Sequence, residues 1–138
     1  MDSSWIITAP LDAVRGTAPA AEGDPAAAGA TMPLADFVRS LEELADLSGN
    51  PMAIWLAGEA MNPAHLGILG CALAAAPALG SALRCFQRFF GTLQSATSAE
   101  LEIDADMAHF RYRILDQDIW PRRADAELTL GLVAGMVR

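Results

Sequence analysis

The chain has 138 residues, of which 53% are hydrophobic and 19% are charged, and its formal net charge is −8 at pH 7. This size and composition are typical of one globular domain with a real core, and they exclude a wholly disordered chain. The excess of acidic over basic residues argues against direct binding of nucleic acid, because a protein needs a basic surface to neutralise the phosphates.

The first segment, residues 1–31, is rich in alanine, proline and glycine and contains the run APAAEGDPAAAGAT. Such a run is typical of a mobile linker. We therefore expect a flexible leader over residues 1–31 and an ordered domain over residues 32–138. The start of the chain is acidic and its apolar run is short, which excludes a signal peptide. Four apolar residues could still anchor a short strand or turn: Trp5, Ile6, Ile7 and Leu11.

The next segment predicts an amphipathic surface helix that begins near Pro33 and ends at Gly49. Proline suits the first helical position, and glycine can adopt the left-handed conformation that ends a helix. Apolar residues recur at helical spacing on one face, and charged residues occupy the opposite face. The apolar face consists of Leu34, Phe37, Val38, Leu41, Leu44 and Ala45. The apolar run 52–60 around Trp55 is compatible with either a helix or a strand.

Residues 63–91 are the most apolar part of the chain, and Pro77 divides them. Because a helix tends to stop before proline and can restart on it, we expect two helices, at residues 65–75 and 77–90. The first is apolar all round, so we expect it to be buried nearly all round, with the other elements wrapped around the pair. Pro77 in the middle of the run and the charges of Arg84 and Arg88 argue against a membrane span.

The two cysteines and two histidines give little indication of chemistry. Cys71 and Cys85 fall on the two central helices at a spacing unlike that of metal sites, and we interpret them as buried free thiols in a reducing compartment. His109 lies in a predicted strand, where we expect an exposed side chain. With no local nucleophile or metal-ligand pattern around either histidine, we predict no catalytic residues, no metal and no cofactor. The carboxylates are expected on solvated faces.

After residue 98 the hydrophobic period changes from helical to two, which predicts a β-hairpin with one buried and one solvated face. An acidic first strand can face a basic second strand across the pair. The chain then enters a last apolar helix over residues 121–137. The sequence therefore predicts an α+β fold in which a central apolar helix pair, an amphipathic N-terminal helix and the C-terminal helix pack on a β-hairpin or small antiparallel sheet.

The order and spacing of several motifs over residues 32–138 resemble the N-terminal effector-binding and dimerisation domain, called arabinose-binding-like, of AraC/XylS-type bacterial transcriptional regulators. Members of that family usually carry helices before the Pro-Leu opening, and continue past the position of Arg138 with more strands and two helix-turn-helix motifs. No such motif is found here, so we expect an incomplete regulator. The matching motifs are Pro33-Leu34, Gly49-Asn50-Pro51, Leu66-Gly67-x-Leu69-Gly70, Ala76-Pro77-x-Leu79-Gly80-x-Ala82-Leu83 and Arg122-Arg123-Ala124-Asp125-Ala126-Glu127.

The resemblance implies a cytoplasmic sensor that forms a homodimer and holds a small apolar or amphipathic effector between its helices and sheet. From the net charge of −8 and the arguments against a membrane span, we expect no direct nucleic-acid binding by this chain and no membrane contact. Two other interpretations remain open: a structural dimerisation domain without a ligand, and an enzyme that no motif identifies. Candidate ligand-binding residues are the aromatics near the junction of helices and hairpin, although the pattern of each favours an ordinary core position: Trp55, Phe86, Phe90, Tyr112 and Trp120.

Overall fold

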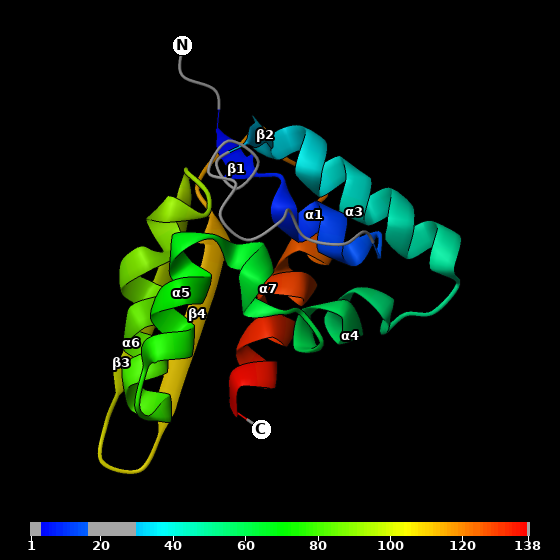
Figure 1. The fold of residues 1–138 in the computed structure, drawn as a ribbon. Helices are drawn as coiled ribbons and strands as arrows, with labels where there is room; N and C mark the ends of the chain where they lie inside the picture. The colour runs from blue at the N-terminus through cyan, green and yellow to red at the C-terminus, as the bar shows by residue number, and fades with distance from the viewer. Residues whose placement is uncertain (1–3, 17–29, 138) are drawn as a thin grey trace.

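The computed structural model describes residues 4–16 and 30–137, which have an α+β fold. Figure 1 shows α1, α3, α4 and α7 on one side of the molecule and α5, α6 and the hairpin of β3 and β4 on the other, with β1 and β2 near one end. In chain order the elements are β1 (Trp5–Ile7), α1 (Ala9–Val14), β2 (Thr31–Pro33), α3 (Leu34–Ser48), α4 (Ala53–Glu59), η1 (Pro63–Leu66), α5 (Ile68–Ala75), α6 (Leu79–Phe89), η2 (Phe90–Thr92), β3 (Thr97–Ile103), β4 (Ala108–Ile114) and α7 (Arg123–Val137).

The buried apolar side chains form two clusters. The helix cluster consists of Ile6, Leu11, Leu34, Phe37, Val38, Leu41, Ile54, Ile114, Ile119, Ala124 and Leu128. The hairpin cluster consists of Ile7, Leu66, Leu69, Leu83, Phe86, Phe90, Leu93, Leu132 and Val133. Strand β1 contributes to both, because successive side chains of a strand point to opposite faces. Met61 and Tyr112 pack against both clusters and so link them.

The expected flexible leader is wrong for residues 4–16. β1 pairs antiparallel with β2, with Ile6 opposite Met32. The side chains of Ile6 and Leu11 are 1% and 3% exposed, so both belong to the core. Burial of these side chains gives the short segment enough apolar contact to order it, in spite of its composition. Residues 17–29, which carry most of the Ala/Pro/Gly run, lie outside the described residues.

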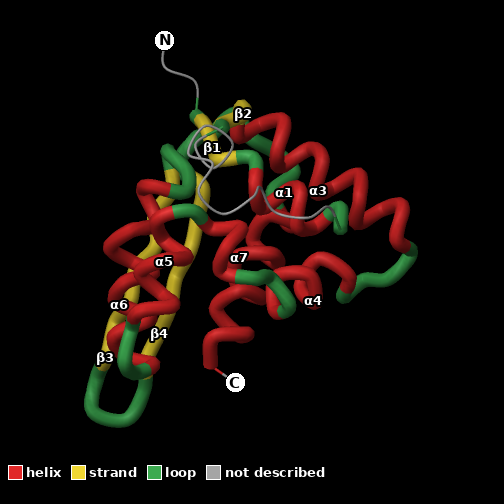
Figure 2. The backbone as a smooth tube through the Cα atoms, in the orientation of Figure 1, coloured by secondary structure: helices red, strands yellow, loops and turns green. Residues whose placement is uncertain are grey.

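The amphipathic helix and the hairpin are confirmed. α3 ends at Gly49, which has a φ of 66°. Strands β3 and β4 lie side by side (Figure 2) and pair antiparallel, with Leu101 opposite Phe110. The Arg111 Nη1 atom lies 2.8 Å from the Glu102 Oε2 atom on the solvated face, an exposed ion pair of the kind that contributes little to stability. The ambiguous run around Trp55 forms helix α4.

The expectation that the first central helix is buried nearly all round is wrong. In α5 the buried residues are Leu69 and Gly70, whereas Ile68 is 65% exposed. Cys71 is exposed and Cys85 is half-buried, so the predicted burial of the thiols is also wrong. The reason is that alanine supplies much of the apolar pattern, and small side chains can remain in water at little cost. Within the described residues, none of the helices combines the length and apolar character that a transmembrane span requires.

Glycines bring α4 and α7 into close contact. A methyl group added at Gly58 would collide with the carbonyl oxygen of Leu128, and one added at Gly131 would collide with the carbonyl oxygen of Trp55. A methyl group at Gly135 would lie 2.6 Å from the carbonyl oxygen of Glu59. The backbones of the two helices are therefore in direct contact, which larger residues at these positions would prevent.

We predict that Gly131→Ala lowers the free energy of unfolding by about 1–3 kcal/mol or more, because the new methyl group must push two backbones apart. Urea denaturation at constant pH measures this change. The matched control is Gly80→Ala in α6, where an added methyl group meets no atom within 4 Å. This control should leave the free energy of unfolding unchanged or raise it by up to ~1 kcal/mol. Equal effects of the two substitutions would contradict the close contact of α4 and α7.

Candidate functional site

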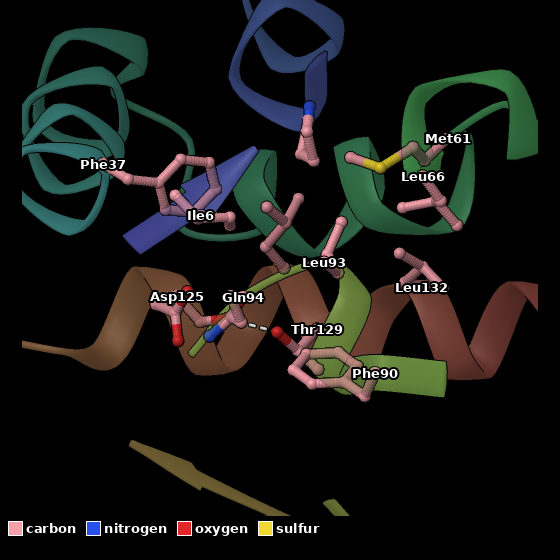
Figure 3. A pocket seen from close by; sticks show the side chains of 12 residues that line it. Ile6, Phe37, Met61, Leu66, Phe90, Leu93, Gln94, Asp125, Thr129 and Leu132 are labelled. Carbon is pink, nitrogen blue, oxygen red and sulfur yellow. Dashed lines mark hydrogen bonds between the residues drawn. The ribbon is translucent and has the colours of Figure 1, made fainter. Parts of the chain in front are cut away.

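A cavity of about 20 Å³ lies where the helix cluster and the hairpin cluster meet (Figure 3). Most of its wall is apolar, and three polar side chains complete it. A volume of this size holds about one water molecule. The lining residues are Ile6, Pro10, Phe37, Met61, Leu66, Phe90, Leu93, Gln94, Asp125, Leu128, Thr129 and Leu132.

Side chains from β1, α1, α3, the connection between α4 and α5, residues 90–94 and α7 meet at this cavity. Along α7, Asp125, Thr129 and Leu132 recur at the spacing of one helix face, so the same face carries polar and apolar wall residues. Ile6 of β1 forms an isolated antiparallel bridge with Gln94, which places Gln94 beside the strand. Leu66 and Met61 approach the cavity from the connection between α4 and α5 (Figure 3).

The polar side of the cavity is a chain of hydrogen bonds that joins three segments. The Gln94 Nε2 atom donates to the Tyr112 hydroxyl oxygen at 2.7 Å. The Tyr112 hydroxyl donates to the Asp125 Oδ2 atom at 2.6 Å. The Thr129 hydroxyl donates to the backbone carbonyl oxygen of Asp125 at 3.0 Å. Because Tyr112 belongs to β4 and Asp125 to α7, this chain joins the hairpin to the last helix.

Asp125 is the buried acid of this site, with 1% of its surface exposed. Burial raises the pKa of its carboxyl group to about 6, because the charged form loses its hydration. The hydrogen bond from Tyr112 and the charge of Arg122 act in the opposite direction, while the charge of Glu42 adds to the rise. Burial also raises the pKa of Tyr112 far above its usual value, and the neighbouring Asp125 charge adds to this effect.

Two charged side chains fix the start of α7. The guanidinium of Arg122 donates to the carbonyl oxygens of Ile119, Ile114 and Asp116 at 3.1, 2.6 and 2.9 Å. The Glu42 Oε1 atom, from α3, accepts a hydrogen bond from the Ala124 backbone N–H at 2.8 Å. This contact satisfies one of the free N–H groups of the first helical turn.

The structure brings three of the five predicted ligand-binding aromatics together. Phe86, Phe90 and Tyr112 form a cluster, with ring centroids 5.2 Å apart for Phe86 and Phe90 and 5.5 Å apart for Phe90 and Tyr112. Phe90 itself lines the cavity. Trp55 lies apart from it on α4, where its indole N–H donates to the Glu59 Oε1 atom at 2.7 Å. Trp120 is 69% exposed, and the Arg122 guanidinium carbon lies 3.9 Å from its ring centroid.

Sequence reasoning missed the polar wall residues. The expectation that the carboxylates lie on solvated faces is wrong for Asp125. A signal was present, because Asp125 precedes Leu128 and Leu132 by three and seven residues and so shares their apolar face. His109 is exposed, as predicted. Among the described residues, no group of three or more His, Cys, Asp and Glu side chains could hold a metal ion.

We predict that Asp125→Asn removes a pH dependence of stability. Because the pKa of this carboxyl group rises from 3.8 to about 6 on folding, the folded protein binds more protons than the unfolded chain between these values. The stabilisation from the neutral carboxyl is complete below pH ~4 and is lost as pH rises through ~6, a fall of about 3 kcal/mol. The free energy of unfolding of Asp125→Asn, measured in urea from pH 4 to 7.5, should lack this fall.

The control for the loss of one acidic group is Asp106→Asn, which changes an exposed residue at the hairpin turn. This variant should keep the pH slope of the unsubstituted protein. If the slope survives in Asp125→Asn, the buried carboxyl is not its source.

Comparison with known protein families matches residues 11–138 to the arabinose-binding domain of AraC transcription regulators, N-terminal. No curated protein matched the chain. The matched range includes most of α1, which lies before the predicted start of the domain, and ten of the twelve residues that line the cavity, all except Ile6 and Pro10. This family is a regulatory ligand-binding domain and not an enzyme family. The chain therefore belongs to the family of N-terminal arabinose-binding domains of AraC transcription regulators.

Proposed function

We propose that this domain binds a small apolar or amphipathic effector at the cavity between the helix cluster and the hairpin cluster. The observation that carries the proposal is the mixed wall, in which Gln94, Asp125 and Thr129 face an otherwise apolar space. Ligand sites typically combine an apolar lining with a few placed polar groups. Family membership supports a regulatory role for such binding.

The cavity must widen to hold an effector, because about 20 Å³ accommodates roughly one water molecule. The cavity lies where the two apolar clusters meet, so widening requires a local shift of the side chains that line it. Met61 is half-buried and packs against both clusters, and an unbranched methionine can adapt to a new shape. An effector that prefers the wider arrangement would shift the domain toward it.

We also propose that the domain forms a homodimer in the cytoplasm and leaves DNA binding to another part of the regulator. Each described sheet has two strands, so each hairpin strand has one edge without a β partner among the described residues. Such edges favour pairing with another chain. The hairpin suits this role better than α7, whose buried residues extend from Ala124 to Val133. The net charge of −8 disfavours contact with DNA.

A second candidate function is a dimerisation domain without a ligand. The small volume of the cavity favours this alternative, because a closed core needs no effector for stability. Both candidate functions involve a homodimer, and they differ in whether a ligand can occupy the cavity.

We predict that native mass spectrometry of the purified 138-residue chain shows a dimer carrying a reproducible extra mass. Met61→Trp should remove the extra mass and keep the dimer, because the larger side chain fills the widened cavity. The matched control is Met107→Trp, at a position 60% exposed beside the hairpin turn, which should keep both. A dimer without extra mass in the unsubstituted protein would favour the ligand-free alternative.

We predict that sedimentation velocity at increasing concentration shows a monomer–dimer equilibrium that favours the dimer. The physical reason is the unpaired edge of the two-stranded hairpin, which is marginal in isolation. A stable monomer at high concentration would contradict both candidate functions that involve a dimer.

A further inference from the structure

Among the residues that the structure describes, Asp125 has no cationic side chain in an ion pair with it, although a buried acid normally has one. Acidic side chains are rarely buried unless they are paired, because a buried charge loses its hydration. The ion pairs among the described residues join Arg39 to Asp36, Arg111 to Glu102 and Arg123 to Glu127, and none involves Asp125. Arg122 is the cation that acts on its charge from a distance, but its guanidinium N–H groups are committed to three backbone carbonyls.

The Asp125 side chain lines the cavity, so a molecule bound there could supply a positive charge. Asp125 is the charged residue of the lining, and the oxygens of Gln94 and Thr129 offer further acceptors beside it. Figure 3 shows these three side chains on one side of the cavity, with Met61 and Leu66 on the opposite side. The wall is therefore suited to a molecule that is polar at one end and apolar over the rest.

We propose that the effector carries a protonated amine that binds the Asp125 carboxylate, with a compact apolar body against Met61, Leu66 and Leu132. This inference rests on the proposed function and names the chemical class of its effector. An ammonium group supplies the missing positive charge and three N–H donors. A carboxylate or phosphate ligand would instead be repelled by Asp125.

The charged groups around Asp125 support this choice of sign. Tyr112 of β4 donates a hydrogen bond to it, Glu42 of α3 adds negative potential, and Arg122 before α7 adds positive potential. The two acids outnumber the one cation, so the polar wall is negative when Asp125 is ionised. Since burial raises the pKa of Asp125 to about 6, the wall is ionised at pH 7.5 and mostly neutral at pH 5. Amine binding should therefore weaken as the pH falls from 7.5 to 5.

The experiment compares three probes that share one apolar ring: cyclohexylamine, cyclohexanol and cyclohexanecarboxylate. Each is titrated into the 15N-labelled 138-residue chain at pH 7.5, and amide shifts of cavity residues report binding. We expect the amine to bind about tenfold more tightly than the alcohol, as one charge-assisted hydrogen bond would provide, and the carboxylate to bind least. The preference for the amine should fall at pH 5.

The variant that tests the carboxylate is Asp125→Asn, which keeps an oxygen that can accept from Tyr112. It should bring amine binding down to the level of the alcohol and leave alcohol binding unchanged. The matched control, Glu102→Gln, removes an exposed charge on the hairpin and should keep the amine preference.

The outcomes separate this inference from the proposed function. If the alcohol or the carboxylate shifts the cavity residues as strongly as the amine, or if Asp125→Asn keeps the preference, the assignment of an amine is wrong and effector binding at the cavity stands. If none of the probes shifts the cavity residues, both the inference and the proposed site are overturned.

Discussion

The direct backbone contact between α4 and α7 is the constraint on which the site depends. Gly58, Gly131 and Gly135 let the two helices approach until a single methyl group would not fit. This contact fixes both the rotation and the position of α7, because displacing the helix along its axis would bring larger side chains against the backbone of α4. With α7 held in this way, the face that carries Asp125 and Leu132 must point toward the cavity. The site is therefore set by the packing of an adjacent face of the same helix.

The same helix accommodates an unfavourable charge at its start. Asp125 lies in the first turn, where the positive end of the helix dipole favours an anion. Glu42 and Arg122 hold this turn in place through backbone groups, which leaves the Asp125 carboxylate without an ion-pair partner among the described residues. Tyr112 supplies one short hydrogen bond in place of a salt bridge. A polar group that is costly to bury persists in the core beside a cavity, where a ligand can offset its cost.

Sequence patterns predicted the elements whose two faces differ strongly. α3 and the hairpin alternate apolar and charged residues at clear periods, and Gly49 marks the end of α3. They also predicted the family, through the order of short motifs. The burial of α5 was not predictable in this way, because an alanine-rich helix has the same apolar pattern whether it is covered or exposed. The folding of residues 4–16 depends on long-range contacts, such as the pairing of Ile6 with Met32, which no local pattern contains.

The candidate site was only partly predictable for the same physical reason. Phe86, Phe90 and Tyr112 meet because aromatic side chains at helix and strand spacing pack together, which the sequence indicates. Asp125 becomes part of the site because α7 turns it inward, and the glycines that orient α7 act through a partner helix more than 60 residues earlier in the chain, at Gly58.

The division of the core into two clusters connects this packing to regulation. β1 sends Ile6 into one cluster and Ile7 into the other, and Met61 and Tyr112 contact both. The hydrogen bond from Tyr112 to Asp125 joins the hairpin to α7. A ligand that competes for the Asp125 carboxylate would therefore act on a contact between these two elements. Filling the cavity and loosening the hairpin from α7 would then be one event, and the hairpin edge proposed for dimerisation would respond to the chemistry of a single buried carboxylate.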